Sequence, residues 1–281
     1  MHLRKLTVLI LLLYAAVASA QTKSGFFTTT DGVRIHYLEA GKGPALVLIP
    51  GWTMPADIWE NQMAYFAKNY QVVAIEPRSQ GESSKPTDGN FPERRAADYH
   101  ELIQSLKLPP AVLVGWSLAV PELMAYVDQF GTAQIRGLVL VDGMVTMDES
   151  ITKVMPMFLR AMQMDRRGFT ERFVKSMYRK PQTEAYLSRI VSASLNTPTS
   201  NAVAMQVGAL GHPDWSATLP KLADVPVLYM GEAIMKKQAA AIAEKLPSMK
   251  TEIFEDSGHA IFVDEKERFN SVLENFLATL K

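Results

Sequence analysis

The sequence predicts an α/β fold with a mostly parallel central sheet, flanked by helices and interrupted by an inserted helical cap. Short, mostly continuous apolar runs alternate with amphipathic helical patterns, which is typical of strands covered on both faces. From 144 to 220 this alternation stops, and the residues read as several helices rich in methionine. A long helical insertion between two strands is typical of a lid. We therefore assign 21–143 and 221–281 to the core and 144–220 to the cap.

The first two strands are expected at 26–30 and 33–38, because they flank Asp31-Gly32, a hairpin turn signal. Six more strands are expected, at 45–49, 72–75, 111–115, 138–141, 225–230 and 250–254. The core helices are expected between or after them, at 55–68, 92–106, 121–130, 236–246 and 265–281. The hairpin should therefore add antiparallel strands at one edge of a parallel sheet.

Composition excludes several functional classes. The chain has 281 residues, with 29 basic and 29 acidic side chains, and zero net charge argues against a nucleic-acid partner. It has no cysteine, so disulfides, a thiol nucleophile and cysteine metal sites are excluded. The five histidines lack ligand spacing, so we expect no metal site.

Residues 1–20 read as an export signal. Arg4 and Lys5 precede an apolar run at 6–16, and Ala18-Ser19-Ala20 is a small-x-small cleavage site. The run is shorter than the roughly 20 residues that span a bilayer, so we expect cleavage after Ala20 and no stable membrane anchor. The mature protein should be soluble, in the periplasm or secreted.

The most informative motif follows the expected strand at 111–115. The apolar run ends in Gly115-Trp116-Ser117-Leu118-Ala119, and a helical pattern begins at once. This layout is typical of a nucleophile elbow, in which a sharp strand-to-helix turn exposes a serine hydroxyl. Ala119 stands where the usual pattern has glycine, so the match is near and not complete.

Three further motifs each follow an expected strand: Leu48-Ile49-Pro50-Gly51-Trp52-Thr53, Arg78-Ser79-Gln80-Gly81-Glu82-Ser83 and Asp256-Ser257-Gly258-His259-Ala260. Together with the elbow they resemble the α/β-hydrolase family over essentially the whole chain after residue 20. Besides Ala119, two positions in these motifs depart from that family: Ser79 replaces the first glycine of its Arg-Gly-x-Gly-x-Ser loop, and Pro50 replaces a histidine. The resemblance implies an α/β-hydrolase fold, with Ser117 as nucleophile.

The chemistry assigns a role to each motif. A serine hydroxyl needs a neighbouring base, and His259 would take its proton and later return it to the leaving group. The family places the two oxyanion donors at the backbone N–H groups that here belong to Trp52 and Leu118. We expect the side chains of Trp52 and Trp116 to be walls of the substrate pocket.

The residue that orients His259 is less obvious. The family usually places this acid about three residues after Gly231, where this chain has Ile234. Asp142 at the end of the strand at 138–141 and Glu232 directly after Gly231 are the two alternatives. We favour Asp142, because some relatives place the acid after that strand and the short loop leaves Glu232 little reach.

These residues predict an exported serine hydrolase that cleaves a small or medium, hydrophobic carboxylic ester without a cofactor. The cap methionines favour an apolar substrate: Met155, Met157, Met162, Met164, Met177 and Met205. Lactone or amide hydrolysis, perhydrolysis and carbon–carbon cleavage remain alternatives on the same triad. A non-catalytic ligand-binding protein is a further alternative, motivated by Pro50, Ala119 and Ile234. The expected partner is a small-molecule ester, and the sequence does not indicate the oligomeric state.

Overall fold

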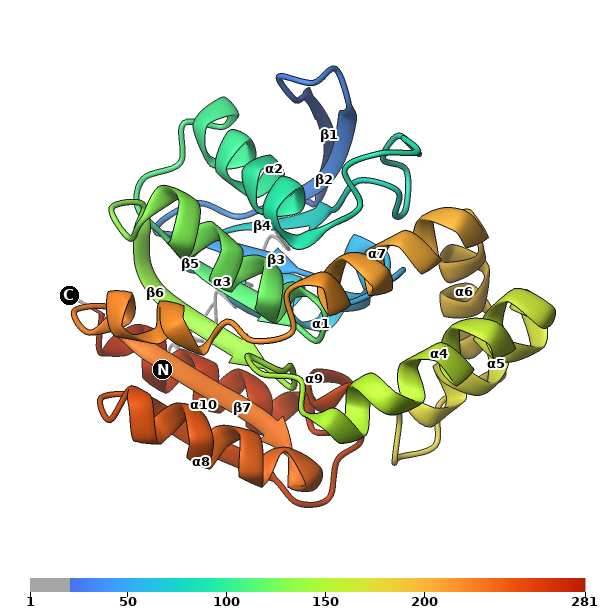
Figure 1. Cartoon of the computed structure of the whole chain (residues 1–281). Coiled ribbons are helices and arrows are strands. Elements are labelled where there is room, and N and C mark those ends of the chain that lie inside the picture. Colours follow the sequence, from blue (N-terminus) through green and yellow to red (C-terminus); the bar gives the residue numbers. More distant parts are fainter. Residues whose placement is uncertain (1–20, 281) are drawn as a thin grey trace, which may run out of the picture.

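The computed structural model describes residues 21–280, so the expected export signal at 1–20 lies outside the described residues. An eight-stranded sheet forms the centre, helices cover both of its faces, and four further helices form an arm at one end (Figure 1). This is the α/β-hydrolase fold that the sequence predicts. Across residues 21–280, none of the helices has the length and apolar character needed to cross a membrane.

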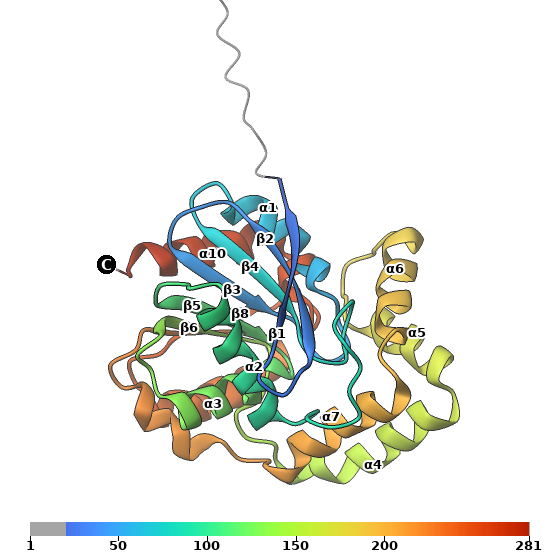
Figure 2. The ribbon, with the colours of Figure 1, turned by 90° about the horizontal axis from the view of Figure 1, so that it is seen from above.

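The sheet has the strand order β1-β2-β4-β3-β5-β6-β7-β8. Its strands are β1 (Lys23–Thr28), β2 (Arg34–Ala40), β3 (Ala45–Ile49), β4 (Gln71–Glu76), β5 (Ala111–Trp116), β6 (Ile135–Val141), β7 (Val227–Glu232) and β8 (Lys250–Phe254). The β1–β2 and β2–β4 pairs are antiparallel and the other pairs are parallel, so the hairpin lies at one edge as expected (Figure 2). The prediction of a strand covered on both faces is wrong for β8, because this strand is the opposite edge and is only partly buried.

Two apolar cores hold helices against the sheet. On one face lie α2 (Pro92–Ser105), α3 (Ala119–Phe130), α8 (Lys236–Lys245) and the 3-10 turn η2 (Ser216–Leu222). On the other lie α1 (Glu60–Phe66), α9 (Ile261–Asp264), α10 (Lys266–Ala278) and the turn η1 (Ala56–Trp59). Successive residues of β5 point to opposite faces, so Leu113 packs in the first core and Val114 in the second. Each such side chain stabilises the fold by about 1.5–3 kcal/mol.

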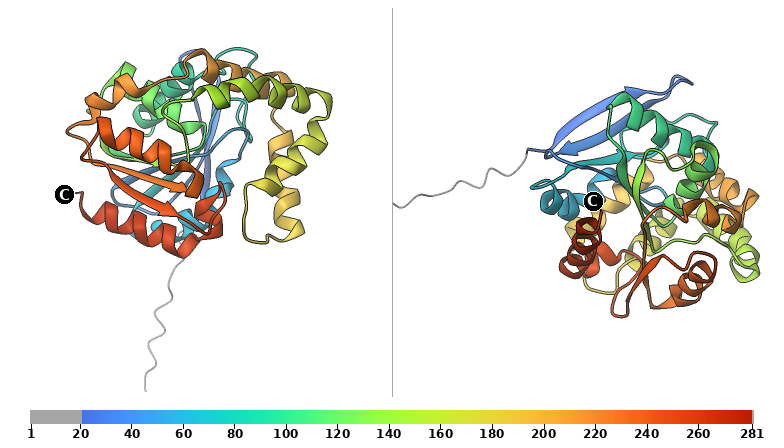
Figure 3. Two further views of the ribbon diagram at one scale, coloured as in Figure 1. Left: turned by 60° about the horizontal axis from the view of Figure 1, so that its bottom comes forward. Right: turned by 90° about the vertical axis from the view of Figure 1, so that its left-hand side faces the viewer.

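The cap lies between β6 and β7, at the carboxyl ends of the parallel strands (Figures 1 and 3). It consists of α4 (Glu149–Met164), α5 (Arg166–Ser176), α6 (Glu184–Leu195) and α7 (Thr199–Gly211). The Asp148 side chain caps α4 by accepting from the N–H groups of Ser150 and Ile151. An isolated bridge between Thr146 and Asp214 joins the two ends of the insertion. The structure therefore ends the insertion near Asp214 and not at 220, because the following η2 packs in the core through Leu219 and Leu222.

Candidate active site

Ser117 sits in a strained turn between β5 and α3. Its φ of 58° lies in the left-handed region that non-glycine residues rarely adopt. The turn needs small neighbours: a Cβ added at Gly115 would lie 2.5 Å from Leu123 Cδ1, and one added at Gly51 would lie 3.0 Å from Ser117 Cβ. The methyl group of Ala119 fits this elbow because Gly115 opposite it has no side chain.

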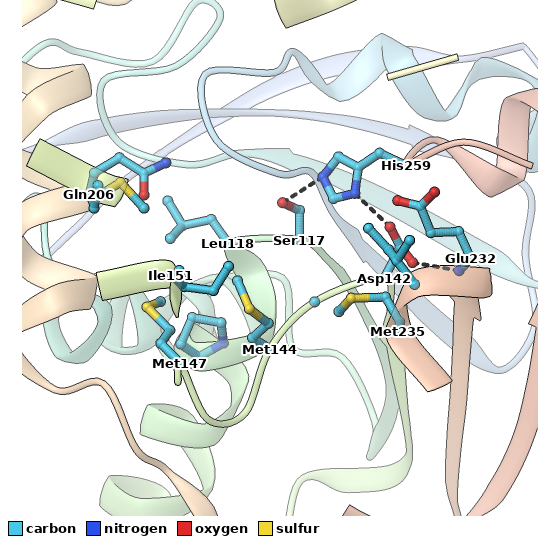
Figure 4. A pocket seen from close by; sticks show the side chains of 14 residues that line it. Ser117, Leu118, Asp142, Met144, Met147, Ile151, Gln206, Glu232, Met235 and His259 are labelled. Atoms are coloured by element: carbon cyan, nitrogen blue, oxygen red, sulfur yellow. Dashed lines mark hydrogen bonds and ion pairs between the residues drawn. The ribbon is translucent and has the colours of Figure 1, made fainter. Parts of the chain in front are cut away.

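The structure brings Ser117, His259 and Asp142 together from three loops at the strand ends (Figure 4). His259 Nε2 lies 2.9 Å from Ser117 Oγ, and His259 Nδ1 lies 2.6 Å from Asp142 Oδ2. If Nδ1 carries the proton and donates it to the carboxylate, Nε2 is left free to accept the serine proton. This geometry is that of a nucleophile, a base and an orienting acid.

The two carboxylates that the sequence leaves open contact His259 differently. Asp142 is buried, and its second oxygen, Oδ1, accepts the backbone N–H of Glu232 at 2.6 Å. The Glu232 side chain lies beside the pair, as Figure 4 shows, and no hydrogen bond joins it to His259 among residues 21–280. Burial, followed by the nearby Asp142 charge, raises the pKa of Glu232. Asp142 is thus the carboxylate placed to orient the imidazole.

Trp116 does not line the pocket, and its expected place in the pocket wall is wrong. Its side chain is 1% exposed, and its Nε1 donates to the carbonyl of His259 at 2.9 Å. The reason is geometric: the elbow turns Ser117 toward the pocket, so the residue before it points into the core. Trp116 therefore supports the loop that carries His259.

Trp52 is also absent from the described residues that line the pocket. Its indole is buried in the cap, where it packs against Phe158, Phe169 and Phe173 and donates to the carbonyl of Ala202 on α7 at 2.8 Å. The expected wall is therefore wrong for this side chain too. The pattern in the sequence shows that an aromatic follows Gly51, but only the position of the cap decides where its ring packs.

The backbone N–H groups of Trp52 and Leu118 fit the expected oxyanion donors. Neither has a hydrogen-bond acceptor within residues 21–280. Trp52 lies in a loop of residues 51–54, hereafter the 51–54 loop, whose Gly51 packs directly against Ser117. Leu118 is the first residue beyond the serine and precedes the first turn of α3. Neither N–H group is therefore engaged by another part of the described chain, as an oxyanion donor requires.

A cavity of about 270 Å³ opens onto these groups. Ser117, Asp142 and His259 lie on its core side, together with Glu232. The remaining walls are mostly apolar, with one amide, and are formed by residues that include Met144, Met147, Ile151, Met155, Gln206, Ile234 and Met235. Of these wall residues, Met155 is among the cap methionines from which the sequence predicts an apolar substrate, whereas Ile234 enters that prediction only as the position that lacks an acid. The signal that could have found Met144 and Met147 is their position in the sequence. Both follow the candidate acid Asp142 within five residues, and both line the cavity.

Asp142, Glu232 and His259 offer ligand atoms that all lie within 4.8 Å of one another, close enough for a metal ion. An ion bound by all three would have to share the Asp142 carboxylate or the His259 nitrogen that already pair with each other. Metal binding and the observed hydrogen bond therefore compete for the same atoms.

Comparison with known proteins agrees with the fold. A family model described as the alpha/beta hydrolase family matches residues 46–272. A non-heme chloroperoxidase of Kitasatospora aureofaciens is 28% identical over 89% of this chain and 98% of its own. An esterase from Exiguobacterium antarcticum superposes with a TM-score of 0.84 at 23% identity, over 90% of this chain and 98% of that one. A bromoperoxidase from Bacillus anthracis superposes with a TM-score of 0.83 at 21% identity, over 91% and 100%. The chain belongs to the alpha/beta hydrolase family, as the sequence motifs indicate.

Proposed function

We propose that the protein is an exported serine hydrolase that cleaves a small or medium, hydrophobic carboxylic ester through an acyl-serine intermediate. One observation carries the proposal: Ser117 Oγ lies 2.9 Å from His259 Nε2, and the other ring nitrogen is held by a buried carboxylate. The export signal expected at 1–20 supports an extracytoplasmic location.

In the first step, Ser117 Oγ attacks the ester carbonyl while His259 takes its proton. Asp142 stabilises the imidazolium that forms and keeps the ring oriented toward the serine. The N–H groups of Trp52 and Leu118 donate hydrogen bonds to the former carbonyl oxygen and stabilise its negative charge. Each such donor is worth about 3–4 kcal/mol of barrier.

The first step ends when His259 gives its proton to the departing alkoxide and the alcohol leaves. The second step releases the acyl group from Ser117. A water molecule then enters, loses a proton to His259 and attacks the acyl-serine. Collapse of the second tetrahedral intermediate returns the proton to Ser117 and frees the acid, so no cofactor is needed.

The pocket supports an uncharged, apolar substrate. Its walls carry methionine and isoleucine side chains, and no Lys or Arg is among the described residues that line it. Two carboxyl side chains, Asp142 and Glu232, face the same space, so an anionic substrate would be repelled. Methionine adapts its shape at low cost, which suits a pocket that accepts related esters.

Covalent labelling tests the proposal. Wild-type protein and Ser117→Ala are treated with a fluorophosphonate, and their intact masses are measured. We expect a single adduct on the wild type and none on the variant, because only an activated serine attacks phosphorus at a useful rate. Folded wild type that takes no adduct would contradict the proposal and favour a non-catalytic binding protein.

Perhydrolysis is the second candidate, favoured by the similarity to a bifunctional esterase/perhydrolase of Acinetobacter calcoaceticus, which is 32% identical over 42% of this chain and 44% of its own. Hydrogen peroxide would replace water in the second step and release a peracid from the same acyl-serine. Peracid formation can be measured beside ester hydrolysis at matched ester concentration. A rate of peracid formation that exceeds the rate of hydrolysis would make perhydrolysis the main reaction.

A further inference from the structure

We propose that Gln80 is a positioning residue that orients the oxyanion donor of Trp52, an inference that rests on the proposed hydrolase function. Gln80 is fully buried. Its side-chain Nε2 donates to the carbonyl of Gly51 at 3.1 Å and to the carbonyl of Met54 at 2.7 Å. One amide thus holds both ends of the 51–54 loop.

The bond to Gly51 acts on the donor itself. The Gly51 carbonyl and the Trp52 N–H belong to one planar peptide group, and the peptide bonds of the described chain are trans. Fixing the carbonyl therefore fixes the direction of the N–H, which points to the opposite side. A hydrogen bond accepted by the carbonyl also polarises the same group, so the N–H becomes a stronger donor.

On its cap side the loop is held by two contacts: Trp52 Nε1 donates to Ala202 O, and Thr53 Oγ1 lies 2.8 Å from Ser194 Oγ. On its core side the loop has little else to hold this geometry. Thr53 has a φ of 61°, in the left-handed region that only a supporting environment maintains for a β-branched residue. Pro50 before the loop has no N–H to donate. Within the loop one backbone bond is present, from Met54 N to Gly51 O at 3.2 Å. The two bonds from Gln80 are therefore the main restraint from the core side.

Gln80 is itself held rigidly, so it can act as a fixed reference. Its main chain is tied into a turn, in which Gln80 N donates to Pro77 O at 2.9 Å and Gln80 O accepts from Ser83 N at 3.0 Å. Its Oε1 accepts from Arg95 Nη2 at 2.8 Å. This contact fixes which end of the amide faces the 51–54 loop, because a guanidinium only donates.

Arg95 extends the connection to the second oxyanion donor. It is buried on α2 and forms an ion pair with Glu122, which is buried on α3. The same helix α3 begins directly after Leu118. A continuous chain of buried polar contacts therefore links the helix behind one donor to the loop that carries the other.

Two variants and one control test the proposal. Gln80→Glu keeps the shape and the acceptor for Arg95, but turns the donor that faces two carbonyls into an acceptor. Gln80→Met keeps the length without any polar group, so it serves if the first variant does not fold. Tyr99→Phe is the control, because Tyr99 donates to Glu122 in the same buried network and has no hydrogen bond to the 51–54 loop in the described structure.

We expect both Gln80 variants to lower kcat by about 10–100-fold, less than the 10²–10³ of a lost donor, with KM changed less than about threefold. Inhibition by a trifluoromethyl ketone, which forms an oxyanion on Ser117, should weaken by a similar factor. Tyr99→Phe should change neither kcat nor the inhibition, even where it lowers Tm as much as the Gln80 variants do. Unchanged kcat in a folded Gln80 variant, or equal losses in the control, would overturn the proposal.

A readout without turnover separates this proposal from the hydrolase assignment. Amide hydrogen exchange of the peptide covering residues 50–58 should be faster in both Gln80 variants than in wild type and in Tyr99→Phe. Unchanged exchange would overturn the restraint whether or not the protein is a hydrolase. If only the hydrolase assignment were wrong, fluorophosphonate would not label the wild type, but the difference in hydrogen exchange would remain.

Discussion

The core side and the cap side of the pocket are built in different ways. On the core side, the reactive residues continue the sheet: Ser117 N donates to Val141 O at 2.8 Å, and Asp142 N donates to Met230 O at 2.7 Å. On the cap side, the wall comes from the segment between β6 and α4, from α4 itself and from α7. Met162 is the one buried residue of α4. The core side of the pocket is fixed by hydrogen bonds to neighbouring strands, whereas the cap side is held by side-chain contacts.

The difference matches the demands on each half. Proton transfer requires hydrogen-bond distances, and small displacements of the reacting groups cost large factors in rate. Binding an apolar group requires only a dry surface of suitable size, which flexible methionines provide. We infer that substitutions on the core side change kcat, whereas those on the cap side change which ester is preferred.

The largest effect should come from the core side. Asp142→Asn is expected to lower kcat by about 10⁴-fold, because the imidazole loses its orienting carboxylate. Glu232→Gln is the matched control, since it removes a neighbouring carboxyl that has no hydrogen bond to His259 in the described structure, and it should lower kcat by less than about tenfold. Steady-state kinetics on one ester measures both. The reverse order of effects would move the orienting role to Glu232.

Most of the core could be predicted from the sequence because its patterns are local. The continuous apolar run of β5, the small residues around Ser117 and the position of His259 after β8 can each be read within a few residues. Predicting Asp142 as the orienting acid required only a choice between the ends of two strands, β6 and β7. The order of the strands also follows once the family is recognised, since connections in such sheets obey strong rules.

The cap side could not be predicted in the same way. Which face of α4 points to the pocket depends on how the cap packs on the core, because only Met162 of this helix is buried and other apolar residues on it, such as Met157, are exposed. The same limit explains the errors at Trp52 and Trp116, both of which are buried by tertiary contacts. The role of Gln80 is also invisible in the sequence, because its partners lie 26 and 29 residues away.

A substitution on α4 sharpens the comparison from the cap side. Ile151→Trp should fill part of the cavity and lower kcat/KM for long acyl esters by about tenfold relative to short ones, since each lost methylene contact is worth about 0.8 kcal/mol. The rate with a short ester should be nearly unchanged. The measurement is kcat/KM across a series of p-nitrophenyl esters of increasing chain length.

Met157→Trp is the control for this series. It adds the same side chain to the same helix at a position that is 75% exposed and is not among the residues that line the cavity. Its chain-length profile should match that of the wild type. Equal profiles for Ile151→Trp and the wild type would show that the acyl group binds elsewhere.

The smallest effect lies where the two halves meet, at Glu232. Burial and then the Asp142 charge raise the pKa of Glu232 in the folded protein, so the native state holds this proton more tightly than the unfolded chain. The stability that the protonated Glu232 carboxyl contributes is complete below the unfolded pKa of about 4.3 and is lost as pH rises through the higher folded pKa.

Glutamine is neutral at every pH. Glu232→Gln should therefore raise Tm by about 1–3 °C at pH 8, a small shift because the group is partly exposed, and should change it little at pH 4. A Glu232→Gln variant that instead lowers Tm at pH 8, with the loss vanishing toward pH 4, would mean that Glu232 is stabilised as a carboxylate and that the imidazole has two charged partners.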